Sequence, residues 1–118
     1  MADSLTYNNI IAGKSIPLKH RAGTITGGNF VAGTVLGKIT ASDKLTKIDS
    51  TKTDGSQKIY GVLLEDCDAS TVDKIASVGL TGEYNKQAMV FGGADTAATH
   101  ETDARLLQIY FEDTIRNY

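Results

Sequence analysis

One short stretch constrains the fold more than any other: residues 59–68, IYGVLLEDCD, an apolar run that ends abruptly in acids and a cysteine. A short run rich in Ile, Val and Tyr and bounded by turn-forming residues predicts a buried β-strand. The acids cannot follow the strand into a core, because an unpaired buried carboxylate is very costly. The strand must therefore emerge near Glu65. We expect the glycine-punctuated segments on either side to be strands that pack around it as the centre of a small domain.

The length and composition indicate one β-rich domain. At 118 residues the chain can build a single core, and its apolar fraction of 41% is ordinary for a soluble fold. Few aromatics, no Trp and 12 Gly suit strands and turns better than a helical bundle. There is no apolar run of membrane length and no signal peptide, so we expect an intracellular origin and no membrane partner.

The charge pattern predicts no nucleic-acid partner. The net charge is −2, whereas nucleic-acid binders usually carry a concentrated basic patch. The nearest candidates, Lys14, Lys19, His20 and Arg21, are interpreted as a solvated surface.

Acids follow the central strand, so a cation site is a hypothesis to weigh. Calcium loops place oxygen ligands at fixed alternating positions around a glycine, and Glu65, Asp66 and Asp68 do not follow that pattern. The single cysteine excludes an intramolecular disulfide framework and a multi-cysteine zinc site. We therefore expect no metal and no cofactor.

The chain also lacks a recognisable catalytic constellation. Cys67 has no histidine near it in sequence, because His20 and His100 are both distant. The glycine pairs at 27–28 and 92–93 lack the context of a phosphate-binding loop. We expect a protein that is not an enzyme and has no small-molecule substrate.

The first 29 residues differ from the rest, and we predict two parts: an N-terminal arm over residues 1–29, extended or partly mobile, and a β-rich domain over residues 30–118. Residues 1–9 are too polar to fold alone. The apolar residues that follow argue against a simple frayed terminus and for an arm that packs on something. The proline among them removes a backbone donor, which suits an extended arm or an edge strand. The predicted contact residues are Ile10, Ile11, Ile16, Pro17 and Leu18.

The remaining pattern predicts strands and one helix. Residues 33–40 and 45–48 read as a possible hairpin, and residues 72–78 and 79–85 read as two further strands. Asp95 is a good N-cap for a helix that ends near Leu107, with a final strand over residues 108–112, although the periodicity also allows one helix to the end. The predicted fold is mainly β: a small barrel or sandwich-like domain with one short C-terminal helix and an extended N-terminal arm.

Several segments, taken in order, resemble the bacteriophage lambda-type head decoration proteins. They are GTVLGKIT (33–40), GVLLEDCDA (61–69) and TGEYN (81–85), followed by Ala88, FGG (91–93) and IY (109–110). The resemblance covers about residues 30–111, and its specificity comes from the order and spacing of these segments.

The resemblance implies a capsid-stabilising structural protein of the virion. Such proteins assemble as homotrimers on the outer surface of an expanded phage head, where they bind the major capsid protein and cement neighbouring coat subunits against internal pressure. The implied arm is mobile in the free protein and orders on the capsid. The protein would be made in the host cytoplasm.

Other classes of function compete with this interpretation. One is another virion or tail structural protein with a related β-barrel, and a second is a small ligand-binding barrel of cellular origin. A third is a hydrolase built around Cys67 and a histidine, for which the supporting constellation is missing. The arm could also be an ordinary edge strand packed on its own trimer.

Overall fold

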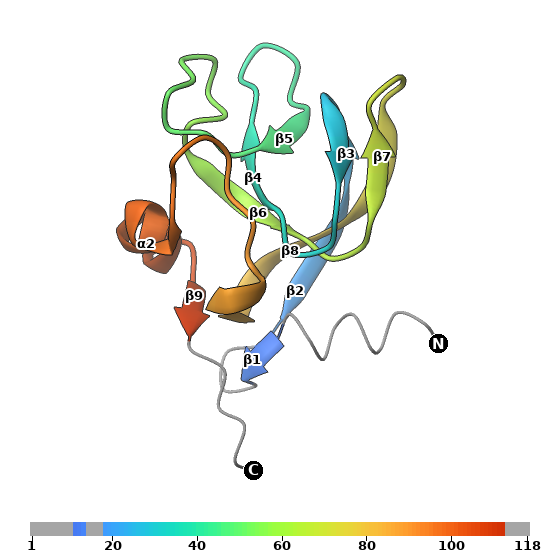
Figure 1. Cartoon of the computed structure of the whole chain (residues 1–118). Helices are drawn as coiled ribbons and strands as arrows, with labels where there is room; N and C mark the ends of the chain where they lie inside the picture. Colours follow the sequence, from blue (N-terminus) through green and yellow to red (C-terminus); the bar gives the residue numbers. More distant parts are fainter. Residues whose placement is uncertain (1–10, 14–17, 113–118) are drawn as a thin grey trace.

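The computed structural model describes residues 11–13 and 18–112, and this part of the chain is mainly β with one short C-terminal α-helix (Figure 1). The predicted fold class is confirmed. No helix in the described part is long and apolar enough to cross a membrane. The elements are β1 (Ile11–Gly13), β2 (Lys19–Ile25), β3 (Gly28–Phe30), β4 (Val35–Lys38), β5 (Leu45–Lys47), β6 (Ile59–Leu63), β7 (Cys67–Ala69), β8 (Lys74–Asn85), the 3-10 turn η1 (Lys86–Ala88), α2 (Ala97–Leu106) and β9 (Ile109–Glu112).

Five strands close into a barrel in the order β8, β2, β5, β4, β6 and back to β8. Every neighbouring pair is antiparallel except β2 and β5, which are parallel and meet at Ile25 and Leu45. Strands β3 and β7 form a separate two-stranded ribbon beside the barrel. The last part of β8 leaves the barrel and pairs with β1 and β9.

The organising strand is β8, and not β6 as the sequence suggested. It is 12 residues long, whereas the pattern predicted two separate strands over residues 72–78 and 79–85. β8 stays extended through its glycines because β2, β6, β1 and β9 all pair with it. At Gly79 a side chain has no room, since a Cβ there would lie 2.1 Å from the hydroxyl oxygen of Tyr84.

The barrel strands β4 and β6 are covered on both faces, which explains their continuous apolar runs. Leu36 and Leu63 belong to a hydrophobic cluster inside the barrel. Their neighbours Val35 and Val62 belong to a second cluster that lies against α2 and β9. The prediction that residues 59–64 are a buried strand is confirmed, and the chain emerges at the exposed Glu65 as expected.

The local predictions around this strand are also largely confirmed. β4 and β5 form the predicted antiparallel hairpin. The C-terminal segment is a helix followed by a strand, separated by Gln108 with a positive φ of 63°. The helix start was wrong by one residue, because the N-cap is Thr96 and not Asp95. The Thr96 N–H donates to the hydroxyl of Thr99, while Asp95 has other partners.

The strands β1 and β2 and most of β3 fall within the range predicted as an N-terminal arm. β2 pairs with β8 along all 7 of its residues, and β3 pairs with β7. The segment that we consider as the N-terminal arm below is therefore limited to residues 1–18. Residues 1–10 and 14–17 lie outside the described residues, and the division of the chain into arm and body stays a prediction.

Candidate functional site

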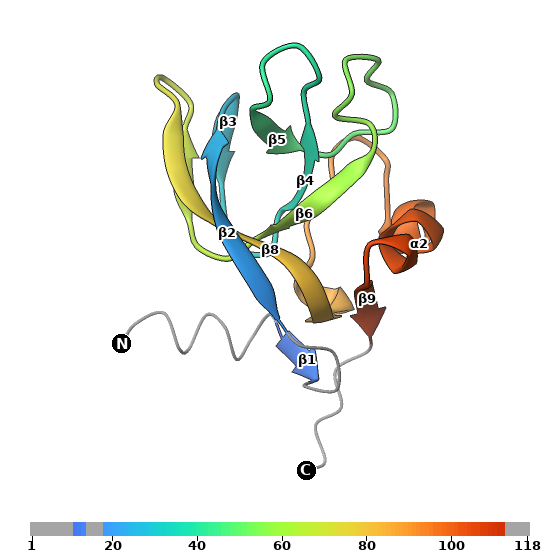
Figure 2. The same cartoon turned by 180° about the vertical axis from the view of Figure 1, so that it is seen from behind.

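The two described ends of the chain meet in a small sheet below the barrel, which we call the terminal sheet (Figures 1 and 2). Its middle strand is the last part of β8, and β1 and β9 lie on either side. β1 is antiparallel to β8, with Ile11 opposite Tyr84 and a register irregularity before Gly13. β9 is parallel to β8, with Ile109–Glu112 opposite Gly82–Asn85.

Both outer strands of the terminal sheet are edge strands in the described part of the chain. For β1 and for β9, the only strand partner among the described residues is β8. An edge strand presents a row of backbone N–H and C=O groups that can pair with a strand from another chain. This end of the molecule therefore has the chemistry of a strand-addition site.

The structure places two of the predicted arm residues at the terminal sheet. Ile11 lies in β1, opposite Tyr84. Leu18 is half-buried and packs against the hydrophobic cluster beside α2 and β9. The other three predicted contact residues, Ile10, Ile16 and Pro17, lie outside the described residues.

Aromatic side chains pack the terminal sheet against the rest of the molecule. The Tyr84 side chain is fully buried, and its hydroxyl donates to the carbonyl of Thr81 at 2.8 Å. Opposite Tyr84 on β9 lies Phe111, whose ring meets that of Phe91 edge-on at 5.8 Å between centroids. The sheet is thus anchored to the loop that precedes α2.

A polar cluster around the buried Asp95 side chain fixes α2 to the loop after β5, and sequence reasoning missed it. Asp95 accepts hydrogen bonds from the N–H of Ser50 at 2.7 Å and from the Ser50 hydroxyl at 2.6 Å. His100 Nε2 lies 2.8 Å from Asp95 Oδ2, and the two side chains are 4% and 6% exposed. The ring of Phe91 stacks on His100 at 5.7 Å. Nothing in the sequence links Ser50 to Asp95, because the two residues are 45 positions apart.

The geometry of this cluster is structural rather than catalytic. Burial raises the pKa of Asp95, but the hydrogen bonds from Ser50 and His100 outweigh this effect and the net shift is downward. Since an ionised carboxylate only accepts hydrogen bonds, His100 Nε2 carries the proton. The carboxylate stands between the serine and the histidine, whereas an activated nucleophile requires the histidine next to the serine.

The acids that follow β6 accept hydrogen bonds from backbone N–H groups of other residues. Glu65 accepts from the N–H of Ser77 at 2.7 Å, and Asp66 accepts from the N–H of Ala32 at 2.8 Å. Asp68 accepts from the N–H and the hydroxyl of Ser70, two residues ahead. Within the described ranges, no group of three or more His, Cys, Asp or Glu side chains is arranged to hold a metal ion.

Cys67, on β7, lies in the hydrophobic cluster that the barrel shares with the β3–β7 ribbon and is 7% exposed. Burial raises the pKa of its thiol, and the negative charge of Glu65 adds to the effect. A thiol in this environment is a packing group rather than a nucleophile.

Comparison with known families identifies the class of the protein. The family described as bacteriophage lambda head decoration protein D matches residues 7–109, which is most of the chain and includes all of the barrel and α2. A comparison with curated proteins gave no match. The matching family consists of structural phage capsid proteins and is not an enzyme family. The chain therefore belongs to the bacteriophage lambda head decoration protein D family, as a head decoration protein that associates with the capsid of the virion.

Proposed function

We propose that this protein binds the outer surface of the expanded phage head as a homotrimer and cements neighbouring subunits of the major capsid protein against internal pressure. In this proposal it is made in the host cytoplasm and joins the capsid from outside. The observation that carries the proposal is β1, an edge strand at the end of the molecule where both described chain ends lie. Such a strand can extend its pairing to a coat strand without any change in the barrel.

The base of the arm is well anchored, which suits a clamp. Leu18 packs on the hydrophobic cluster, and the N–H of Lys19 donates to the Thr81 hydroxyl at 3.1 Å. From Lys19 onward the chain is held by β8. A pull on the arm is therefore transmitted directly to the longest strand of the barrel. In this role Ile10, Ile11 and Ile16 supply apolar contacts with the coat, and Pro17 restricts backbone pairing to one side of the arm.

Cementing follows from binding linkage. A ligand that binds only the expanded lattice stabilises it by RT ln(1 + [L]/Kd), about 4 kcal/mol at a thousand-fold excess over Kd. A trimer that contacts several coat subunits gains avidity, because its second and third contacts are effectively intramolecular. The bound trimer then resists separation of the subunits that it bridges.

Deletion of residues 2–17 tests this function directly. The shortened chain keeps Leu18 and the barrel, so we expect it to fold and to form trimers. Its affinity for bare expanded heads should fall at least tenfold, about 1.4 kcal/mol, in a co-sedimentation assay. The matched control is Thr53→Ala, in the exposed loop between β5 and β6 at the opposite end of the barrel (Figure 1), which should bind like the unmodified chain. If the deletion variant binds heads as well as the full chain does, the arm is not the clamp.

A further inference from the structure

The loop between β5 and β6 contains the one Asp-Gly pair of the sequence, Asp54–Gly55. Such pairs are prone to a spontaneous reaction in which the backbone nitrogen of the glycine attacks the side-chain carboxyl carbon of the aspartate. Glycine permits the attack because it has no side chain to hinder its nitrogen. Asp54 is exposed, so burial does not keep its carboxyl group from reacting. Any protection at this pair must therefore come from local hydrogen bonds.

The reaction loses one water molecule and then takes one up. The bond from the glycine nitrogen to the aspartate Cγ forms while the Cγ–OH bond of the protonated carboxyl group breaks. The amide proton and the hydroxyl leave as water, and a five-membered succinimide ring remains. Water then opens the ring at Cγ, which restores aspartate, or at the main-chain carbonyl carbon, which gives isoaspartate. The first step therefore requires an amide nitrogen that can lose its proton and a carboxyl group that is protonated.

Hydrogen bonds oppose both requirements at Asp54. The N–H of Gly55 donates to Oε1 of Gln57 at 2.8 Å. Oδ1 of Asp54 accepts from the N–H of Ser56 at 3.0 Å and from the Ser56 hydroxyl at 2.6 Å. These two bonds favour the ionised carboxylate and hold the pKa of Asp54 below its usual value. The attacking nitrogen is thus engaged elsewhere, and the carboxyl group is kept in its unreactive form.

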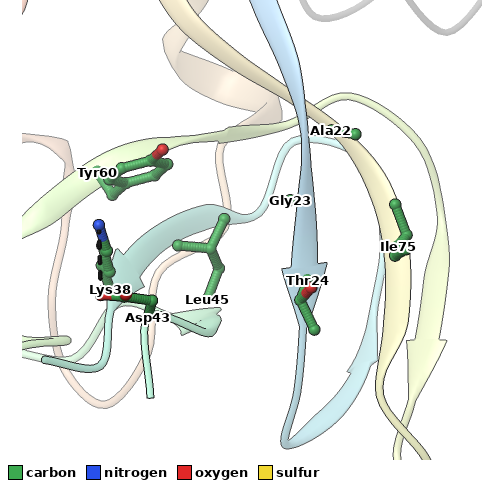
Figure 3. Close-up of a pocket in the computed structure, with 8 residues that line it drawn as sticks. All are labelled: Ala22, Gly23, Thr24, Lys38, Asp43, Leu45, Tyr60 and Ile75. Carbon is green, nitrogen blue, oxygen red and sulfur yellow. Dashed lines mark ion pairs between the residues drawn. The ribbon is translucent and has the colours of Figure 1, made fainter. Parts of the chain in front are cut away.

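The fold requires the glycine of this pair. Gly55 has a φ of 108°, a conformation that residues with side chains rarely adopt. A Cβ at Gly55 would also lie 2.7 Å from the carbonyl oxygen of Lys38, at the end of β4. The Lys38 ammonium pairs with Asp43 at 3.5 Å (Figure 3). Beside it, the N–H of Thr40 donates to the carbonyl of Asp54 at 2.9 Å. A bulkier residue at position 55, which would slow the reaction by steric hindrance, is therefore excluded.

A second aspartate in the same loop shows the same arrangement with different partners. Asp49 is followed by Ser50, another small residue. Oδ1 of Asp49 accepts from the N–H of Thr51 at 2.9 Å and from its hydroxyl at 2.7 Å. The N–H of Ser50 donates to Oδ2 of Asp95 at 2.7 Å. At both sites the carboxylate is bonded two residues ahead, and the next N–H donates to a separate side chain.

We propose that Asp54 is a latent site of isoaspartate formation, which Gln57 and Ser56 keep unreactive in the folded chain. Asp95 protects Asp49 in the same way, through the N–H of the residue that follows it. This protection is a property of the single chain and does not depend on the homotrimer or on head binding.

Isoaspartate at position 54 would detach the loop from the barrel. The main chain would gain one carbon, and the carbonyl of Asp54 that accepts from the N–H of Thr40 would be displaced. Because a virion does not replace its proteins after assembly, slow damage of this kind would accumulate in a capsid component. The hydrogen bonds of Gln57 and Ser56 therefore extend the lifetime of the intact loop.

Removal of each acceptor tests the proposal at both sites. The unmodified chain, Gln57→Ala and Asp95→Ala are incubated at 37 °C and pH 7.4, and circular dichroism verifies that each is folded. Isoaspartate is measured by digestion with a protease that cleaves before aspartate but not before isoaspartate, followed by mass spectrometry. Isoaspartate at position 54 should form at least tenfold faster in Gln57→Ala than in the unmodified chain. At position 49 it should form at least threefold faster in Asp95→Ala.

Each variant is the control for the other site. The rate at position 49 should be unchanged in Gln57→Ala, and the rate at position 54 should be unchanged in Asp95→Ala. Thr53→Ala, which alters the exposed residue before Asp54, should isomerise like the unmodified chain. In urea, where these hydrogen bonds are lost, the unmodified chain should isomerise at position 54 at least tenfold faster than in the folded state.

Three results would overturn the inference. The first is a Gln57→Ala variant that forms isoaspartate at position 54 as slowly as the unmodified chain does. The second is an unmodified chain that isomerises equally fast when folded and in urea. The third is a faster reaction at both positions in both variants, since general loosening of the loop, and not the loss of the named acceptor, would then control the rate.

Discussion

At the scale of single residues, Asp95 connects the loop after β5 to the helix α2. Its buried carboxylate holds Ser50 in the loop after β5 and His100 on α2 at the same time. Asp95→Ala leaves the buried ring N–H of His100 and the two donors of the exposed Ser50 without their acceptor, so we expect it to lower the free energy of unfolding by about 1–3 kcal/mol in urea titration.

The control for this change is Asp43→Asn. The Asp43 side chain is 77% exposed and forms a 3.5 Å surface ion pair with Lys38. Asparagine tolerates the positive φ of 62° at this site. We expect a loss of less than about 1 kcal/mol, because surface ion pairs contribute little. If Asp95→Ala and Asp43→Asn lowered the free energy of unfolding equally, the Asp95 cluster would contribute no more stability than a surface ion pair.

The same carboxylate predicts a dependence of stability on pH. The pKa of Asp95 is lower in the folded protein than its usual value of 3.8. The stability contributed by its ionised form is therefore complete above the unfolded pKa and is lost as the pH falls through the folded pKa. In urea titrations from pH 6 to pH 3, the unmodified chain should lose more stability than Asp95→Ala. If the free energies of unfolding of the two proteins fell equally between pH 6 and pH 3, this role of Asp95 would be contradicted.

The Cys67 thiol should react slowly with alkylating reagents in the folded protein. Its thiol is buried and its pKa is raised, so the reactive thiolate is scarce at neutral pH. We expect alkylation by iodoacetamide at pH 8 to be at least 100-fold slower in the folded chain than in urea. Cys67→Ser should still bind expanded heads, because the thiol is buried in a different hydrophobic cluster from the one at the terminal sheet. Rapid alkylation of the folded chain, or loss of head binding in Cys67→Ser, would contradict this assignment.

At the scale of elements, the close approach of β4 to the loop before β6 depends on Gly37. A Cβ at this position would lie 2.1 Å from the carbonyl oxygen of Ser56, and backbone atoms cannot easily move away. We expect Gly37→Ala to destabilise the fold by about 2–3 kcal/mol in urea titration.

Gly28→Ala is the matched control for Gly37→Ala. The nearest atoms to a Cβ at Gly28 are side-chain carbons of the Phe30 ring, 2.8 Å away, and a side chain yields more easily than the backbone of Ser56. We expect a loss of about 1 kcal/mol or less. If Gly28→Ala were as unstable as Gly37→Ala, the clash with the Ser56 backbone would not explain the destabilisation by Gly37→Ala.

The elements that could be predicted from the sequence are those with local causes. The buried run of β6, the β4–β5 hairpin and the helix followed by a strand at residues 97–112 all follow from spacing and turn residues. The single strand β8 could not be predicted, because glycines interrupt its pattern and its continuity comes from four partner strands distant in sequence.

The candidate site shows the same division between local and long-range causes. The apolar character of the first 18 residues is visible in the sequence, and two of the residues selected from it, Ile11 and Leu18, lie at the terminal sheet. The Ser50–Asp95–His100 cluster could not be predicted, because it joins three segments through hydrogen bonds that leave no pattern in the chain. The edges of the terminal sheet are likewise known only once the pairing is known.

At the scale of the whole molecule, both described ends of the chain lie at one end of the barrel, in the terminal sheet (Figures 1 and 2). In the proposed trimer, arms that leave from corresponding positions would bind several coat subunits at once, which is the arrangement that gives avidity on a lattice.

The central claim, that the arm is the clamp, is tested most directly by hydrogen exchange of the backbone amides of residues 1–18. The measurement compares the free protein with the same protein bound to expanded heads. Segments that gain order on binding exchange quickly when free and slowly when bound. We predict that exchange across this segment, apart from Ile11–Gly13, which already pair with β8, slows at least tenfold on heads, while exchange in β8 is unchanged. Equal and strong protection of residues 1–18 in both states would contradict the account, because the arm would then be an ordinary edge strand of the trimer's own fold.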